Sequence, residues 1–184
     1  MTVHEIAQWH WVYDPDQQQL QIELEQGMFH PAPYKSSRLV PLHAMRAAFS
    51  TDDAEQFQSF YDAIESSGIV AAQTILEASL NYLIFSRYGR PQMPQSWYFQ
   101  TAEHAPSSLE VGQLVSLNSG MAESICAITS TDGEFVECMV LGGDFPLSDI
   151  KTLRQFDVIK VMPNRLQALH ESHENSTDSH LKQA

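Results

Sequence analysis

The sequence is short of cations and has no long apolar run. Lysine and arginine number 10 against 23 aspartates and glutamates, which gives a formal net charge of -13 over 184 residues. No basic patch with interleaved aromatic residues occurs, so we expect neither nucleic acid nor an anionic membrane as a partner. The apolar runs are too short to span a membrane, and Met1 to Gln8 lacks a signal-peptide pattern, so a cytoplasmic location is expected.

The sequence also lacks the motifs of common enzyme classes. Its 8 glycines are dispersed and form no phosphate-binding loop, and no G-x-S-x-G nucleophile motif is present. His170 and His173 lie beside glutamates, but their spacing differs from that of a zinc-protease helix. Cys126 and Cys138 do not make a disulfide framework. We therefore predict that the chain is not an enzyme and has no catalytic residue, cofactor or metal site.

The first part of the chain begins with a predicted β-hairpin. Aromatic residues alternate from Trp9 to Tyr13, and apolar residues alternate from Leu20 to Leu24, which is the period of half-buried strands. The turn-forming run 14–19 separates them, so the two strands are expected to pair. Met28 can begin a third strand before Pro31 ends the pairing. The run 34–48 is ambiguous and carries a local excess of cations.

Two helices are predicted after the hairpin. The first starts at Thr51, with Asp52 and Asp53 in its first turn, and ends near Gly68. Its apolar residues recur at helical spacing, at Phe57, Phe60, Tyr61 and Ile64. The second helix runs from about Val70 to Tyr88. Strands followed by helices without βαβ alternation indicate an α+β unit.

The second part of the chain predicts only strands. Short strands are expected at 114–117, 124–129, 135–141 and 158–162, with a further strand between Phe145 and Leu153. Strands at this density indicate a small β-barrel-like or strongly curled sheet. The prediction is thus an N-terminal α/β domain (1–103), a C-terminal β-barrel-like domain (104–169) and a disordered polar tail (170–184).

The hairpin turn at Thr131, Asp132 and Gly133 leaves two registers open. A three-residue loop would place Cys126 opposite Cys138. A two-residue loop would place Cys126 opposite Met139. In either case the simplest interpretation of the cysteines is as small buried hydrophobic residues.

The stretch from Arg87 to Phe99 connects the two parts and combines unusual residues. Gly89 is expected to end the second helix in a left-handed conformation, and Pro91 and Pro94 favour an extended backbone. Three aromatic residues close the stretch. It is either a connector that its aromatic residues lock over the core, or a rigid apolar groove with a cationic rim.

Several motifs resemble the ZapC family of Z-ring-associated bacterial cell-division proteins, in the same order and at similar spacing from Trp9 to Leu166. They are Trp9-x-Trp-x-Tyr-Asp14, Gly27-Met28, Pro91-Gln-Met-Pro-x-Ser-Trp97-x-Phe99 and Asp157-x-Ile-Lys-x-Met162-x-x-Arg165-Leu166. The Pro-Gln-Met-Pro stretch with its tryptophan is the most specific part. The chain departs from the pattern at Gln95, where a lysine is expected, and at Phe156, where a small turn residue is expected.

The resemblance implies a cytoplasmic, non-enzymatic protein at the mid-cell division ring. Members of this family bind FtsZ, promote lateral association of its protofilaments, stabilise the polymer and reduce its GTPase turnover. Bundling requires two contacts per particle, which either two sites on one monomer or a dimer would supply. We expect a monomer. The alternative is a small-molecule-binding or hydrolytic enzyme with a site between the two domains.

The resemblance also directs attention to particular residues. FtsZ filaments and this chain are both acidic, so their long-range interaction is repulsive, and binding must rest on desolvated apolar contacts with a few local cations. The predicted partner-binding residues are Arg90, Met93, Trp97, Phe99, Ile22, Leu24 and Arg87. Core packing is the competing interpretation for Ile22, Leu24 and Trp97. Arg90 is the leading candidate, because an arginine between a glycine and a proline after a helix end has little other role.

Overall fold

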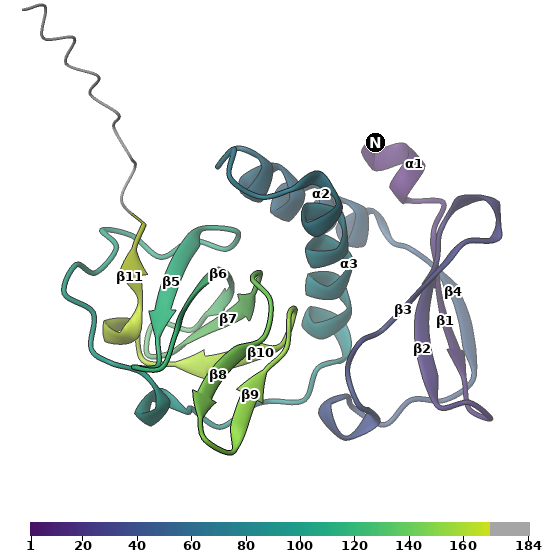
Figure 1. Ribbon diagram of the computed structural model, residues 1–184. Coiled ribbons are helices and arrows are strands. Elements are labelled where there is room, and N and C mark those ends of the chain that lie inside the picture. The colour runs from purple at the N-terminus through teal and green to yellow at the C-terminus, as the bar shows by residue number, and fades with distance from the viewer. Residues whose placement is uncertain (170–184) are drawn as a thin grey trace, which may run out of the picture.

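The computed structural model describes residues 1–169, which form two packed parts with α3 between their sheets (Figure 1). The elements of the first part are α1 (Val3–Ile6), β1 (His10–Asp14), β2 (Gln19–Glu23), β3 (Phe29–Pro31), β4 (Met45–Ala48), α2 (Thr51–Glu65) and α3 (Ala72–Tyr88). Those of the second part are β5 (Leu114–Asn118), β6 (Glu123–Thr131), β7 (Val136–Val140), β8 (Phe145–Ser148), β9 (Lys151–Leu153), β10 (Val158–Val161) and β11 (Gln167–Ala168). The predicted α+β class is confirmed.

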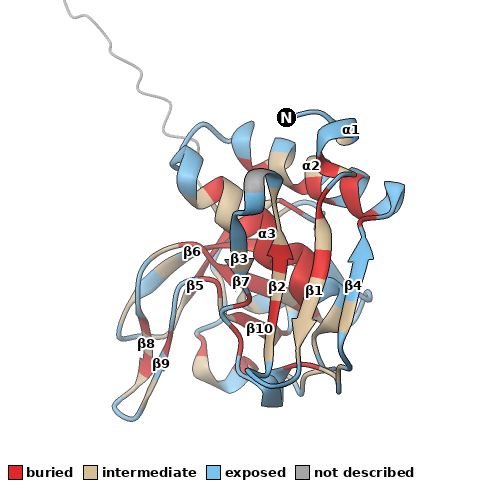
Figure 2. Ribbon diagram, turned by 90° about the vertical axis from the view of Figure 1, so that its right-hand side faces the viewer, coloured by how far each residue is buried: buried red, intermediate tan, exposed pale blue. Residues whose placement is uncertain are grey.

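The first sheet is antiparallel, with strand order β3-β2-β1-β4. The predicted hairpin is β1–β2, in which Trp11 pairs with Ile22 and Tyr13 with Leu20. The third strand also forms. β4 comes from the run that the sequence left ambiguous, and it lies at the sheet edge with mostly exposed residues (Figure 2).

The two predicted helices are α2 and α3. Ser50 and Asp53 form a capping box at the start of α2, each side chain accepting a hydrogen bond from the other's backbone N–H. Gly89 ends α3, but the expected left-handed conformation is wrong: its φ is -67° and its ψ is 139°. The chain leaves the helix extended, in an isolated bridge with Leu39. Glycine is needed here for a close approach, because a Cβ would lie 2.5 Å from the carbonyl oxygen of Phe85.

The second sheet is antiparallel, with strand order β10-β7-β6-β5-β11, and β8 and β9 pair separately. The expected barrel-like unit is not closed. β10 pairs only with β7 and the two-residue strand β11 only with β5, so both remain sheet edges. The single strand expected between Phe145 and Leu153 is the β8–β9 hairpin.

Both registers considered for the cysteines are wrong. Cys126 pairs with Val140, and Cys138 pairs with Ile128. The ladder shifts between Ile128 and Ser130, and this irregularity could not be read from the length of the turn. The inward orientation was nevertheless expected, and both thiols are buried and free.

The buried residues form two clusters. The first contains the inward faces of β1, β2, α2 and α3, and also takes Ala127, Met139 and Val158 from the second part of the chain. The second lies within the second part and includes both cysteines. The predicted boundary at 103/104 stays a prediction, and the predicted tail (170–184) lies outside the described residues. In the described chain, no helix is long and apolar enough to cross a bilayer.

Candidate partner-binding site

The connection after α3, which we call the crossover (residues 89–101), is held by backbone hydrogen bonds. Gln95 N–H donates to the carbonyl oxygen of Lys160 at 2.8 Å, and Gln100 N–H donates to that of Asn118 at 2.8 Å. The Ser96 hydroxyl oxygen accepts from Met162 N–H at 2.8 Å. The crossover therefore follows the second sheet as an ordered segment and presents its side chains on a fixed backbone.

Two large apolar side chains of the crossover point to solvent. Met93 is 81% exposed and Trp97 is 70% exposed. The Trp97 ring has one aromatic neighbour, Tyr98, at a centroid distance of 5.7 Å. Folding gains little from such exposed groups, whereas exposed apolar side chains on a rigid segment suit a protein interface. Met93 and Trp97 therefore do not lock the stretch over the core, and the apolar groove with a cationic rim stays a prediction.

Arg90 lies at the start of the crossover, between two hollows. Its Nε donates to the carbonyl oxygen of Leu39 at 2.6 Å, and no carboxylate within residues 1–169 forms an ion pair with it. A cavity of about 200 Å³ is lined by Arg90, Tyr82, Phe85, Pro91 and Glu137, among others. A second cavity of about 340 Å³ is lined by Arg90 together with Tyr13, Leu39 and Leu42, among others. The guanidinium thus borders two hollows of mixed polar and apolar lining and forms no ion pair within residues 1–169.

Glu137 brings a carboxyl group to the first of these hollows. Burial raises the pKa of Glu137, while the nearby Lys160 ammonium acts in the opposite direction. The carboxyl is therefore protonated more readily than one in solvent.

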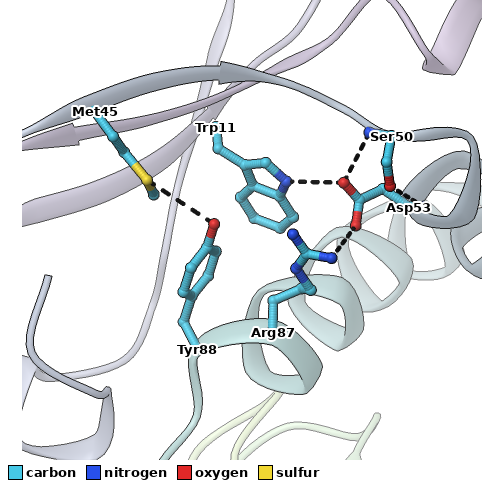
Figure 3. A network of polar contacts seen from close by, with 6 residues as sticks. All are labelled: Trp11, Met45, Ser50, Asp53, Arg87 and Tyr88. Carbon is cyan, nitrogen blue, oxygen red and sulfur yellow. Dashed lines mark hydrogen bonds and ion pairs between the residues drawn. The ribbon is translucent and has the colours of Figure 1, made fainter.

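Arg87 belongs to an internal polar network (Figure 3). Its guanidinium lies 3.2 Å from Asp53 Oδ1, and Asp53 is only 1% exposed. The other carboxylate oxygen, Oδ2, accepts from Trp11 Nε1 at 3.2 Å and from Ser50 N–H at 3.0 Å. This network joins β1, α2 and α3, so the charge of Arg87 has a partner inside the fold.

The remaining predicted residues divide between the two cores. Ile22 is fully buried in the first cluster, with Leu24 half-buried against it. Phe99 is 5% exposed and lies in the second cluster, 6.0 Å from the Phe145 ring. The structure therefore brings Arg90, Met93 and Trp97 to the surface of one segment and leaves Ile22 and Phe99 inside. Partner binding by any of the seven stays a prediction.

Sequence reasoning missed two cations beside the crossover. Lys151 Nζ on β9 donates to Gln95 Oε1 at 3.0 Å and lies 5.0 Å from the centre of the Tyr98 ring. An Arg38 nitrogen donates to Gln92 Oε1 and to the carbonyl oxygen of Val158, both at 2.9 Å. Gln95 replaces a lysine expected from the family pattern, and Lys151 restores an ammonium at the same place. The cation excess in 34–48 was a signal for Arg38, but no local signal marked Lys151.

Comparison with known proteins gives a consistent family. Residues 4–90 match the family model "Cell-division protein ZapC, N-terminal" and residues 91–172 match "Cell-division protein ZapC, C-terminal". The chain is 37% identical over 161 residues to the Cell division protein ZapC of Idiomarina loihiensis, covering 87% of each chain. It is 32% identical over 168 residues to that of Aeromonas hydrophila, covering 90% of this chain and 92% of the relative. The chain therefore belongs to the ZapC family of cell-division proteins.

Proposed function

We propose that this protein binds FtsZ directly at the mid-cell division ring in the cytoplasm. In this proposal it promotes lateral association of FtsZ protofilaments, stabilises the polymer and lowers its GTPase activity. The family assignment supports a role in cell division. The observation that carries the proposal is the exposure of Met93 and Trp97 on the same ordered segment as Arg90, which forms no ion pair within residues 1–169.

The binding mode follows from the types of these side chains. Tryptophan and arginine dominate the energetics of protein interfaces, because they combine a large contact area with directional polar groups. Trp97 is already exposed on a fixed backbone, so binding costs little backbone entropy. Two acidic proteins repel at long range, and apolar burial with a local cation is a contact that can overcome this repulsion.

Bundling requires that one particle contact two protofilaments. We expect a monomer, so the proposal needs a second contact on the same chain, and a dimer would supply the two contacts by symmetry. Sedimentation-velocity ultracentrifugation of the free protein distinguishes these arrangements. If the protein is a dimer at the concentrations that produce bundling, the contact with the second protofilament would come from the other copy of the chain.

The enzyme alternative has no support from the comparisons, in which the relatives bear a cell-division name. Mixing experiments separate the two functions. An FtsZ-bundling protein raises light scattering of FtsZ with GTP and lowers phosphate release, and an unrelated enzyme does neither.

Co-sedimentation with polymerised FtsZ tests direct binding. Wild-type protein is expected in the pellet only when FtsZ and GTP are both present. Trp97→Ala is expected to weaken binding about thirtyfold, the loss of a central interface anchor worth about 2 kcal/mol. Ile69→Ala is the matched control, because Ile69 is 60% exposed and lies outside the crossover. Equal pelleting of wild type with and without FtsZ polymer would refute the proposal.

A further inference from the structure

One edge of the first sheet is open. β4 (Met45–Ala48) ends the strand order β3-β2-β1-β4, and its residues are mostly exposed (Figure 2). Phe49 N–H donates to the carbonyl oxygen of Trp9 at 2.8 Å, and ladder bonds in an antiparallel pair recur at every second residue. The backbone N–H and C=O groups of Arg46 and Ala48 therefore point away from β1. Within residues 1–169, no other segment forms a hydrogen bond with these groups.

The other edges of the two larger sheets are blocked or covered. Pro31 lies on β3 and has no N–H to offer a further strand. On β10, the carbonyl oxygen of Lys160 accepts from Gln95 N–H at 2.8 Å. On β11, Ala168 N–H donates to the carbonyl oxygen of His104 at 2.8 Å. β4 is therefore the exception among the edge strands of these two sheets in the described chain.

The side chains of β4 also leave this edge uncovered. Natural edge strands are commonly guarded by charged side chains, prolines or bulges. Arg46 forms an ion pair with Glu23 on β2, so its guanidinium reaches back across β1 and not over the edge. Met45 Sδ accepts from Tyr88 OH at 3.9 Å, so this side chain is directed at α3. The other two residues of the strand are alanines.

The free groups of β4 are self-complementary. A twofold axis at Ala47 would set Arg46 of one copy opposite Ala48 of a second copy, and the reverse. Each pair would exchange two hydrogen bonds, which is the pattern of an antiparallel ladder. The two Ala47 methyl groups would face each other without a clash, and the two Arg46 side chains would not lie directly opposite each other. A second copy of this chain therefore fits the edge.

We propose that β4 pairs with β4 of a second copy of this chain when both copies are bound to filaments. The inference rests on the proposed function and supplies the second contact that bundling requires, because each copy holds one protofilament and the paired copies hold two. The two sheets lie on opposite sides of α3, and the crossover follows the second sheet from Gln95 onward (Figure 1). Both contacts are therefore accessible at the same time.

Filament binding is required because the strand pairing alone is weak. Stable interfaces bury about 1,200–2,000 Å² of surface, and two four-residue strands with small side chains can supply only part of this. We therefore expect the free protein to stay a monomer. Copies bound along neighbouring protofilaments are at a high effective concentration, and many weak contacts then act together.

Ala48→Pro tests the pairing. Proline removes an N–H that faces away from β1, so the β1–β4 ladder is kept while the edge is blocked. The variant should pellet with polymerised FtsZ at wild-type affinity, but it should no longer raise light scattering. Ala48→Val keeps the N–H, so it is the matched control and should scatter as wild type. Thermal melting checks that both variants are folded.

Cysteine cross-linking tests the same register without proline. Ala47→Cys would bring two thiols face to face at the twofold axis, in a pair whose Cα atoms lie about 4.5 Å apart. With a mild oxidant, its disulfide dimer should form about tenfold faster with FtsZ and GTP than without FtsZ. Ile69→Cys is the control for crowding on the filament, because Ile69 is 60% exposed and lies outside β4. Cys126 and Cys138 are buried and do not compete.

The outcomes separate the pairing from the proposed function. Wild-type scattering by folded Ala48→Pro, or equal acceleration of cross-linking in Ala47→Cys and Ile69→Cys, would overturn the pairing and leave FtsZ binding intact. Loss of pelleting by folded Ala48→Pro would show that the edge contacts FtsZ itself, which also overturns the pairing. Failure of the wild type to pellet with FtsZ would overturn the proposed function, and the pairing with it.

Discussion

Replacing Arg87 with alanine tests whether this cation serves the fold or the partner. The substitution removes the ion pair of Asp53 Oδ1, an oxygen that has no hydrogen-bond partner within residues 1–169, on a carboxylate that is 1% exposed. Removing one partner of a fully buried ion pair costs about 3–5 kcal/mol. The Arg87 side chain is 43% exposed, and Asp53 keeps two hydrogen bonds through Oδ2, so solvent screening lowers the expected loss to about 2 kcal/mol.

The loss is measured as a change in the free energy of unfolding in urea. For a chain of this size it corresponds to a fall in melting temperature of about 4–8 °C. A double-mutant cycle with Asp53→Asn isolates the pair: the double variant should lose less stability than the two single losses added together. Well below its melting temperature, Arg87→Ala should still bind FtsZ. An unchanged melting temperature combined with lost binding would show that Arg87 contacts the partner and that the assignment to the internal network is wrong.

Two further substitutions and two treatments have defined outcomes. Gly89→Ala should destabilise the fold by about 1–3 kcal/mol in urea, because its Cβ would meet Phe85 at 2.5 Å, and a neutral effect would contradict the close approach. Phe99→Ala should lower the free energy of unfolding by about 3–5 kcal/mol, because it leaves a cavity in the second buried cluster. At a temperature where this variant is folded, it should still bind FtsZ. Loss of binding by the folded variant would show that Phe99 contacts the partner. Burial raises the pKa of Cys126 to about 12, so a thiol reagent at mildly alkaline pH should modify neither cysteine until the chain is unfolded, and rapid modification of native protein would refute their burial. Because the folded-state pKa exceeds the ordinary value of 9.0, the unfolded chain releases this proton first, and the free energy of unfolding should fall as the pH rises from about 9 toward 12.

Local patterns predicted the elements whose apolar period is strong. Alternation gave the β1–β2 hairpin, and helical spacing gave α2 and α3. β4 carries small and exposed residues, so it has no period to detect, and only its pairing with β1 makes it a strand. Whether the barrel closes, and the register shift after Ile128, depend on contacts between strands. The spacing of residues within one strand carries no information about those contacts.

The candidate site shows the same division between local and tertiary information. Trp11 and Trp97 are the same residue type, yet one is buried at 1% exposure and the other is exposed at 70%. Arg87 and Arg90 are three positions apart, and only the first faces a buried aspartate. Lys151 reaches Gln95 across 56 residues of sequence, so the cation beside the crossover could be found only from the folded chain.

The affinity of Met93→Ala/Trp97→Ala for polymerised FtsZ tests the central proposal most directly. Both side chains are largely exposed, so the melting temperature should fall by no more than about 2–4 °C, since each surface change costs about 0.5 kcal/mol or less. The proposal predicts that this stable variant no longer co-sediments with FtsZ polymer and no longer raises light scattering. A variant that folds as wild type and pellets with FtsZ at wild-type affinity would contradict it.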